Sequence, residues 1–309
     1  MSSKACSDEE FINLVNTHGV TKAAQILGVN ARTAQRRRIS IEERRDIIIG
    51  KQYKVGSYDA RIPYNLMNGM ILVGSDAHYW PDEITTAHKA FVHLAKELTP
   101  DLIIMNGDVF DGARISRHPP IGYSEKPSVK QELETVDERL TEIHESCKSA
   151  KKLWICGNHD MRFENRLAND AAHYQGVKGF TLQDHFPAWQ FGISTWVNNQ
   201  VVVKHRYKGG VHATHNNTVS AGLSIITGHL HSLKVTPYAD YTGNRFGVDT
   251  GTLAEPYGPQ FDYCEDGPQN WRSGFVVLTF HNGKLLWPEV VHVTAHGQFQ
   301  FRGKVYTVK

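Results

Sequence analysis

The chain has 309 residues, of which 40% are hydrophobic and 10% aromatic, and this composition excludes a disordered or fibrous protein. Lys and Arg number 34 against 32 Asp and Glu, so the formal net charge of +2 neither requires nor excludes a polyanionic partner. No apolar run approaches the roughly 18 residues of a membrane span. The opening residues MSSKACSDEE lack the apolar stretch of a secretory signal. The four cysteines form no CxxC pair, which favours a reducing, cytoplasmic location without a disulfide framework.

The first 55 residues are the basic part of the chain, with ten Lys or Arg against six Asp or Glu. Helical patterns are predicted over residues 8–17, 22–27 and 31–38, with Gly28 ending the second helix and Asn30 capping the third. This pattern resembles a helix-turn-helix. An alanine lies four residues before the glycine of the turn, and the helix after the turn is rich in groups that bind bases and phosphates. The predicted DNA contacts are Arg32, Thr33, Gln35, Arg36 and Arg37. The alternative is an ordinary helical hairpin with a solvated basic face.

Turn-forming residues mark a boundary after this segment. Gly56, Ser57 and Pro63 favour a connector. We therefore assign residues 1–50 to a small all-α, helix-turn-helix-like module, residues 51–66 to a linker and residues 67–309 to a second domain. About 50 residues are few for independent stability, so the module is expected to dock or dimerise, and the oligomeric state stays open.

The second domain begins with alternating strands and helices. Short apolar runs with the length of buried strands occupy residues 70–73, 102–105, 153–156, 201–204 and 224–227. Amphipathic helices are predicted over residues 85–98 and 128–149, between the first three runs. This alternation predicts βαβ units and a largely parallel sheet. Near the end, residues 274–280 and 284–287 flank Asn282-Gly283, which predicts a hairpin with a type I′ turn.

Each of the five apolar runs is followed at once by residues that can bind metal. The runs lead into Asp76-Ala77-His78, Asp108-Val109-Phe110-Asp111, Asn158-His159-Asp160, His205 and His229-Leu230-His231, in that order. Ligands bind α/β sheets beyond the carboxyl ends of the strands, so these side chains should converge. Carboxylate, imidazole and amide ligands suit manganese, iron or zinc better than calcium. The set is too large for one tetrahedral ion, but two ions about 3.5–4 Å apart that share a carboxylate would use it all.

The ordered series DxH, GDxxD, GNHD, His and GHxH resembles the calcineurin-like metallophosphoesterase superfamily over roughly residues 70–231. The resemblance implies an α/β fold, a β-sandwich flanked by helices (αββα), with two divalent ions. Manganese is favoured, with iron, zinc or nickel as alternatives. The implied ligands are Asp76, His78, Asp108 and His231 for one ion, and Asp108, Asn158, His205 and His229 for the other. His159 would protonate the leaving group, and Asp111 would orient its imidazole.

Motif details narrow the resemblance. Serine/threonine protein phosphatases typically carry GDxVDRG and GNHE, whereas this chain has GDVFDG and GNHD. These motifs look more like the branch with DNA-repair nucleases, cyclic-nucleotide phosphodiesterases and phage or prophage phosphoesterases.

Some assignments have alternatives. His212 or His215 could replace His205 as a ligand, but only His205 directly follows a predicted strand. Arg162 and Arg114 follow GNHD and GDVFDG and could bind phosphate bidentately, or could be solvated surface arginines.

Together these features predict a two-metal-dependent phosphoester hydrolase, acting as a phosphodiesterase or nuclease that the N-terminal module directs to DNA. One alternative is a phosphomonoesterase for a small phosphorylated substrate, with a structural N-terminal segment. A second is a non-catalytic DNA-binding regulator. No membrane partner is expected.

Overall fold

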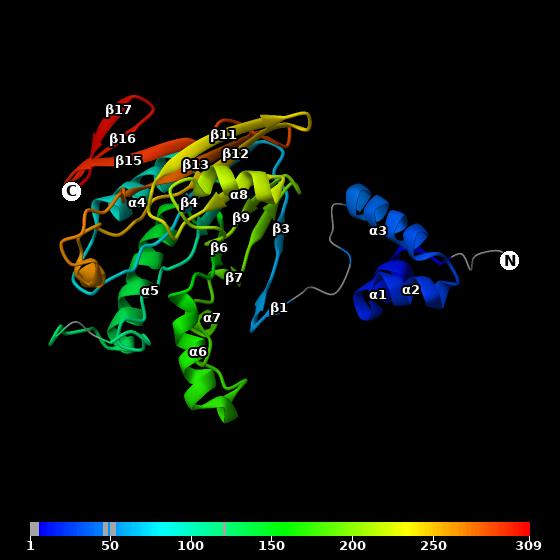
Figure 1. Ribbon diagram of the computed structural model, residues 1–309, viewed down its shortest axis with the longest axis horizontal. Helices are drawn as coiled ribbons and strands as arrows, with labels where there is room; N and C mark the ends of the chain where they lie inside the picture. Colours follow the sequence, from blue (N-terminus) through cyan, green and yellow to red (C-terminus); the bar gives the residue numbers. More distant parts are fainter. Residues whose placement is uncertain (1–5, 46–48, 50–53, 120–121) are drawn as a thin grey trace.

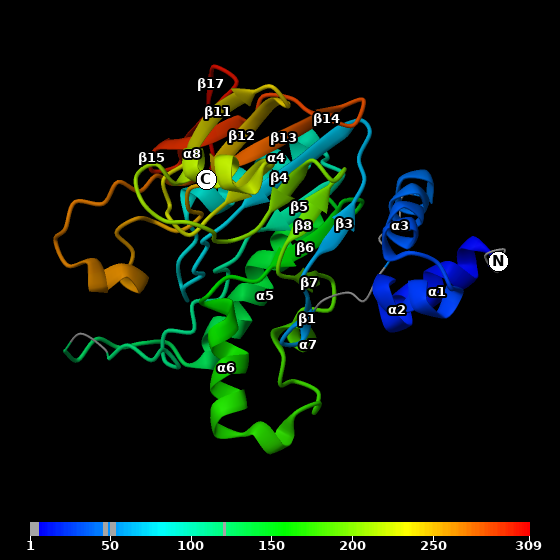
Figure 2. The same ribbon diagram turned by 45° about the vertical axis from the view of Figure 1, so that its right-hand side comes forward.

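The computed structural model describes residues 6–45, 49, 54–119 and 122–309. Figures 1 and 2 show two parts, a unit of three N-terminal helices and a larger domain of sheets and helices. Across the described ranges, no helix combines the length and the apolar character needed to cross a membrane.

The larger sheet has eleven strands. Its order is β1 (Lys54–Val55), β2 (Tyr58–Asp59), β7 (Gln190–Gly192), β6 (Lys151–Ile155), β5 (Leu102–Met105), β4 (Gly69–Gly74), β13 (Gly274–His281), β15 (Glu289–Ala295), β16 (Gln298–Phe301) and β17 (Lys304–Thr307), with β14 (Lys284–Leu285) paired to β13. Strands β7, β6, β5 and β4 pair in parallel, as predicted. The half beyond β4 is antiparallel. From β13 to β17 short connections join successive strands, as antiparallel pairing allows, whereas β4 and β13 pair from distant parts of the chain.

The second sheet has six strands. Its order is β11 (Lys234–Asp240), β12 (Gly243–Asp249), β10 (Ser224–Thr227), β9 (Val201–Val203), β8 (Thr195–Val197) and β3 (Ile62–Tyr64). The fourth and fifth apolar runs therefore belong to this sheet, whereas the first three belong to the larger one. Strands β9 and β10 pair in parallel, so their carboxyl ends lie at the same edge. Buried strands in either sheet are short and apolar, so their sequences do not say which sheet they join.

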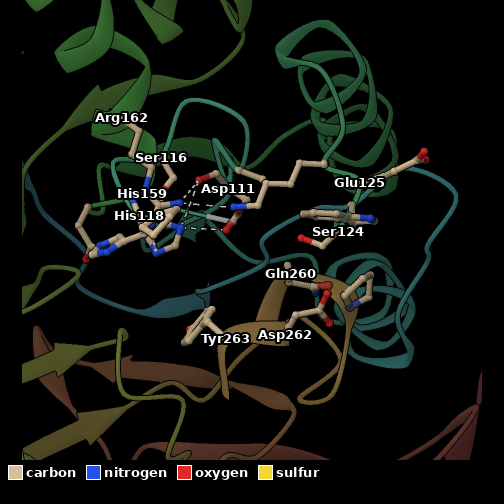
Figure 3. Close-up of a pocket in the computed structure, with 16 residues that line it drawn as sticks. Asp111, Ser116, His118, Ser124, Glu125, His159, Arg162, Gln260, Asp262 and Tyr263 are labelled. Carbon is tan, nitrogen blue, oxygen red and sulfur yellow. Dashed lines mark hydrogen bonds and ion pairs between the residues drawn. The ribbon is translucent and has the colours of Figure 1, made fainter. Parts of the chain in front are cut away.

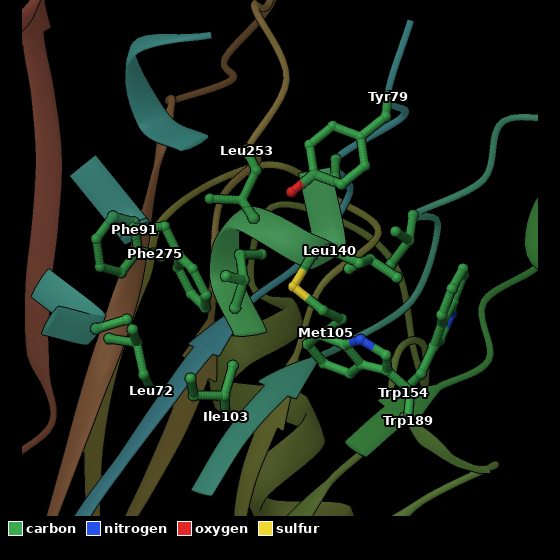
Figure 4. Close-up of a cluster of buried hydrophobic side chains, with 14 of the residues drawn as sticks. Leu72, Tyr79, Phe91, Ile103, Met105, Leu140, Trp154, Trp189, Leu253 and Phe275 are labelled. Atoms are coloured by element: carbon green, nitrogen blue, oxygen red, sulfur yellow. The ribbon is translucent and has the colours of Figure 1, made fainter. Parts of the chain in front are cut away.

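Alternate residues of the central strands face two separate cores. Leu72 and Ile103 point to the outer face, which is covered by α4 (Thr86–Leu98) and α5 (Val129–Ser146) (Figure 4). Their neighbours Ile71 and Ile104 point to the second sheet and pack in the core that contains Val203 and Ile226. On the far side, α8 (Ala213–Ala221) contacts β10, β11 and β12. The layers are thus helix, sheet, sheet, helix.

The local sequence explains where the predicted helices and the hairpin begin. Thr85 Oγ1 accepts the N–H of His88 at the start of α4, and Ser128 forms a capping box at the start of α5. Asn282 and Gly283 have φ of 49° and 75°, as a type I′ turn between β13 and β14 requires. The shorter helices are α6 (Asp160–Asp170), η1 (Ala172–Tyr174), α7 (Leu182–His185) and η2 (Pro259–Cys264).

Residues 54–64, which the sequence placed in a linker, form part of the two-sheet domain instead. Strand β2 pairs with β7 in the larger sheet, and β3 pairs with β8 in the second. Tyr58 and Ile62 are buried in the two cores. Strands of two or three residues are too short to give an apolar run. The turn-forming residues were therefore the clearest local signal, and they predicted a linker. Residues 51–53 of the predicted linker lie outside the described residues.

The N-terminal unit consists of α1 (Asp8–His18), α2 (Val20–Leu27) and α3 (Ala31–Arg45). The three helices surround their own core, which contains Phe11, Val15, Ala23, Ala24, Ala34, Ile41 and Ile49. Gly28 ends α2 with φ of 65°, and Asn30 Oδ1 accepts the N–H of Arg32 at 2.8 Å. Helix α3 extends beyond the predicted end at residue 38 because Ile41 is buried in this core.

Candidate metal centre

The predicted ligand loops meet at one edge of the two sheets. Three loops follow β4, β5 and β6 of the larger sheet, and two follow β9 and β10 of the second. The Asp76 N–H donates to the Gly107 carbonyl at 2.8 Å, and the His78 N–H donates to the Asp108 carbonyl at 2.9 Å. The His229 N–H donates to Asp76 Oδ2 at 2.8 Å, which joins the second sheet to the first.

Two glycines allow the loops to approach this closely. A Cβ on Gly107 would lie 2.4 Å from the ring of His205, and one on Gly157 would lie 2.1 Å from Asp108 Oδ1. Gly107 also has φ of 86°, in the left-handed region that favours glycine. The glycines of the GDxxD and GNHD motifs therefore leave room for ligand side chains.

One cluster of potential ligand atoms comprises Asp76, His78 and His231, with all three atoms within 4.8 Å of one another. His231 Nε2 lies 3.1 Å from Asp76 Oδ1. His78 Nδ1 donates to Asp111 Oδ1 at 2.7 Å, which fixes the ring and leaves its Nε2 free to bind a cation.

A second cluster comprises Asp108, His205 and His229, again within 4.8 Å. His205 Nδ1 donates to the Asn106 carbonyl at 2.7 Å, so Nε2 is the nitrogen that faces Asp108, 3.1 Å from Oδ2. His205 is thus the histidine at this site, whereas His212 precedes α8 and His215 is exposed on that helix.

Unpaired polar atoms show that this donor set fits cations. Asn158 Oδ1 and His231 Nδ1 are buried without a hydrogen-bond partner among the described residues, and His205 Nε2 has only its ion-pair contacts with Asp108 and Asp76. Buried polar atoms are normally hydrogen-bonded, so these three retain free capacity for a ligand. Positive φ angles also gather here, at Asp76, His78, Asp108, His229 and His231. Such strain in non-glycine residues is concentrated at functional sites.

The electrostatics of the clusters favour bound cations. Burial raises the pKa of Asp76, but the charges of His231 and His205 outweigh it and lower the pKa to about 2. Burial likewise opposes ionisation of Asp108, yet His205 and His159 hold its pKa well below the ordinary value. Burial lowers the pKa of His205, but the two carboxylates raise it to about 10. The carboxylates are therefore ionised, with positive charge drawn to the space between them.

His159, Asp111 and Arg162 form a connected group beside the clusters (Figure 3). His159 Nδ1 donates to Asp111 Oδ1 at 2.8 Å, the same oxygen that holds His78. Arg162 Nη1 donates to the Asp111 carbonyl at 2.8 Å, and its Nη2 lies 3.1 Å from His159 Nε2. Burial lowers the pKa of His159, but the Asp108 charge and the Asp111 hydrogen bond raise it above the ordinary value. Asp111 thus orients two imidazoles, a double role that sequence reasoning missed.

Sequence reasoning also missed the role of Asp160, the last residue of GNHD. Its carboxylate accepts five N–H groups, from the backbone of Asp108 (2.9 Å), Val109 (3.0 Å), Phe110 (3.1 Å) and Gly157 (2.7 Å) and from the Trp154 indole (3.0 Å). Asp160 therefore joins the loop after β5 to the loop after β6. The sequence shows that Asp160 ends the GNHD motif, but it does not show that two loops direct five N–H groups at its carboxylate.

Two cavities adjoin this centre. The first, of about 420 Å³, is lined by Trp80, Asp111, His159, Pro259, Gln260 and Tyr263 among others. The second, of about 430 Å³, is lined mainly by arginine and asparagine, and Asn158, Arg162 and His118 border both. Arg162 lies beside the site and lines both cavities, and its role as a phosphate ligand stays a prediction. Arg114 lines neither cavity and donates to the Lys126 carbonyl at 2.6 Å, so it is dropped as a phosphate-binding candidate.

The predicted DNA contacts divide into two groups. Arg32, Thr33 and Arg36 are exposed on α3, and Gln35 is half-buried. Arg37 is turned inward, because its Nη2 donates to the Cys6 carbonyl at 2.7 Å and to Asp8 at 3.0 Å. Its guanidinium also lies 4.8 Å from the centre of the Phe11 ring. Arg37 therefore holds α3 against α1, and we leave it out of the DNA-contacting set.

The motif series agrees with a comparison against known families. A profile of the family described as calcineurin-like phosphoesterase matches residues 69–307. The chain belongs to the calcineurin-like phosphoesterase family. This family membership makes the chain a metal-dependent phosphoester hydrolase. The Asp and His clusters agree with divalent ions as cofactors and leave the metal's identity open.

Solved structures that a comparison matches to this chain include Vps29 of Entamoeba histolytica complexed with zinc, at 14% identity and a TM-score of 0.39, covering 77% of this chain and 97% of that one. A Saccharomyces cerevisiae protein serine/threonine phosphatase is 13% identical with a TM-score of 0.35, covering 77% and 84%. The phosphoesterase Yfce of E. coli is 14% identical with a TM-score of 0.32, covering 71% and 97%. Among curated proteins, no sequence match is found.

Proposed function

We propose that the chain is a phosphodiesterase or nuclease that acts on DNA, with the N-terminal helices as its DNA-binding module. Two divalent ions are proposed, with manganese as the favoured metal. The ligands would be Asp76, His78, Asp108 and His231 for one ion, and Asp108, Asn158, His205 and His229 for the other. Bound ions would supply neutralisation of phosphoryl charge and an activated water nucleophile.

The chain's own residues have distinct roles in this proposal. His159 would protonate the leaving oxygen through Nε2, because Asp111 holds Nδ1 and the raised pKa of the imidazole favours its protonated form. Arg162 Nη2, which is a second donor facing Nε2, would turn from this nitrogen to the substrate. Arg162 would bind a non-bridging phosphoryl oxygen, since its guanidinium already lies beside His159 Nε2.

The diesterase proposal rests on one observation, which is that Asn158 and Arg162 line two cavities. The two cavities share these residues and extend from them along different linings. A phosphodiester carries an organic group on each side of the phosphorus, whereas a monoester carries only one. Two cavities beside one centre therefore favour a diester.

The support for DNA as the partner is the charge distribution on α3. Arg38 pairs with Glu42, and Arg44 and Arg45 pair with Asp8 and Glu9 of α1. Arg32 and Arg36 form no ion pair with any described residue, and both are exposed. They remain available for phosphates, at the start of a helix that follows a glycine-containing turn, as in a helix-turn-helix.

The finer placement of the catalytic domain is also a proposal. GDVFDG and GNHD support the branch that contains phage and prophage phosphoesterases over the serine/threonine protein phosphatases. The clustered His159, Asp111 and Arg162 support catalysis over a purely regulatory role.

One set of assays tests the function. Manganese-loaded protein is compared on p-nitrophenyl phosphate, bis-p-nitrophenyl phosphate, single-stranded DNA and duplex DNA. We expect the diester and DNA to be cleaved, and turnover of the monoester to be slower. Preference for the monoester without DNA binding would support the monoesterase alternative, and DNA binding without any turnover would support the regulator.

A pair of variants tests the DNA-binding role of α3. Arg36→Gln should weaken DNA binding about tenfold in an electrophoretic or anisotropy titration and reduce its salt dependence. Arg38→Gln is the matched control, because it makes the same charge change on the same helix but in a side chain paired with Glu42. Equal loss in both variants would contradict the proposal.

A further inference from the structure

The second cavity beside the metal centre is lined by arginine and asparagine. Arg117, Arg162, Arg166 and Arg206 line it, together with Asn158 and other polar residues, and the described lining contains no Asp or Glu. Four arginines without an acidic residue give this cavity a positive potential.

Three separate segments bring the arginines together. Arg117 comes from the loop between β5 and α5, and Arg206 directly follows the predicted ligand His205. Helix α6 contributes Arg162, Asn165, Arg166 and Asn169. These four positions are three or four residues apart, so they lie on one face of the helix. The face of α6 that lines the cavity therefore carries mainly hydrogen-bond donors and amide groups, with Ala168 as its apolar residue.

Two of these four guanidinium groups are free to bind a ligand, whereas Arg162 already contacts Asp111 and His159. Arg117 and Arg206 are exposed, and neither forms an ion pair or hydrogen bond with a described residue. Arg166 is partly neutralised, because its Nε lies 2.7 Å from Asp170 Oδ2 on the next turn of α6. Arginine presents a planar fork that matches the oxygens of a phosphate group.

We propose that this cavity is a subsite for a second phosphate group of the substrate, next to the phosphate that is cleaved. The inference rests on the proposed phosphodiesterase function and deepens it. Arg162 lies between the two positions, with Asp111 and His159 on one side and the arginine cavity on the other. The first cavity, with Trp80, Pro259 and Tyr263, offers the apolar and aromatic surface that suits a nucleoside. The preferred substrate is then a nucleotide chain with at least two consecutive phosphates.

Three dinucleotide substrates distinguish binding of a second phosphate in the arginine cavity from cleavage of phosphodiesters in general. Metal-loaded protein is assayed on dithymidylate without a terminal phosphate, with a 5′-phosphate and with a 3′-phosphate. We expect one of the two phosphorylated forms to be cleaved with a kcat/KM about tenfold higher than the unphosphorylated form, with the gain mainly in KM. In Arg117→Gln and Arg206→Gln the ratio of these kcat/KM values should fall about tenfold, as for a lost charge-assisted hydrogen bond. Arg206→Lys should restore part of the ratio.

A control and a binding measurement complete the test. Arg302→Gln makes the same charge change at an exposed arginine paired with Glu289, away from the cavity, and should leave the ratio unchanged. Calorimetric titration measures binding of a methylphosphonate-linked dithymidine that carries the preferred terminal phosphate. This probe has no charged phosphodiester bond to be cleaved. Its Kd should rise about tenfold in Arg206→Gln. Failure to cleave any diester would refute the proposed function. Cleavage without a preference for a terminal phosphate, or a preference that survives both Gln variants, would refute the subsite alone.

Discussion

Asp160→Asn tests how much of the centre's geometry depends on one carboxylate that binds no substrate. Oδ2 accepts N–H groups from Asp108, Gly157 and Trp154, and Oδ1 accepts those of Val109 and Phe110. Burial and the Asp108 charge raise the pKa of Asp160 to about 6, so the group is ionised at pH 8. The substitution keeps the shape of the side chain and changes only its hydrogen-bonding pattern.

The magnitude follows from the number of donors. In its best orientation the new amide keeps its oxygen where Oδ2 was and turns its NH₂ toward the N–H groups of Val109 and Phe110. Two buried backbone donors then lose their acceptor, at about 1–3 kcal/mol each, so the free energy of unfolding should fall by about 2–6 kcal/mol. The loop that carries Asp108 also loosens. Loss of such support for a ligand typically weakens metal affinity by about 10–100-fold.

Urea unfolding at pH 8, after a chelator has removed any metal, measures the change in the free energy of unfolding. A manganese titration measures the change in metal affinity. Asp170→Asn is the control on the same helix, because Asp170 is exposed and pairs only with Arg166 among the residues described. An exposed ion pair contributes about 0–1 kcal/mol, so this variant should resemble the wild type. If Asp160→Asn matched Asp170→Asn in both measurements, the carboxylate would have no role in holding the loops.

Other predictions concern the metals, the acid and the pH dependence. Asp108→Asn should abolish stoichiometric metal binding by mass spectrometry as well as turnover, whereas His159→Ala should keep the metals and slow only the cleavage of esters with poor leaving groups. Chelation should lower the melting temperature, and added manganese should restore it in a concentration-dependent way, because ions that bind only the folded state stabilise it. Burial raises the pKa of Glu132 from 4.5 to about 8, so its ionisation costs stability as pH rises between these values, by up to about 1.4 kcal/mol per pH unit. Urea midpoints from pH 5 to 8 should therefore fall more steeply in the wild type than in Glu132→Gln.

The sequence predicted which side chains come together at the candidate site because its motifs are local. Asp76 and His78, or His229 and His231, are two residues apart directly after a strand, so a short segment defines both the residues and their place. The edges of regular elements were predictable for the same reason, as Ser128 at the start of α5 shows. The linker prediction failed where strands of two or three residues depend on partners far along the chain, because β2 and β3 gain their hydrogen bonds from β7 and β8.

The remaining features depend on contacts between segments that no local pattern encodes. Arg37 and Arg36 are adjacent in a basic run, yet only the fold of α1 against α3 decides that one is paired with Asp8 and the other is free. The arginine cavity has the same origin, since Arg117, Arg166 and Arg206 belong to different loops and a helix. These arginines can be substituted without altering any of the metal-binding motifs. We therefore expect the metal ligands to determine the type of reaction, and these convergent arginines to determine which phosphoester reaches it.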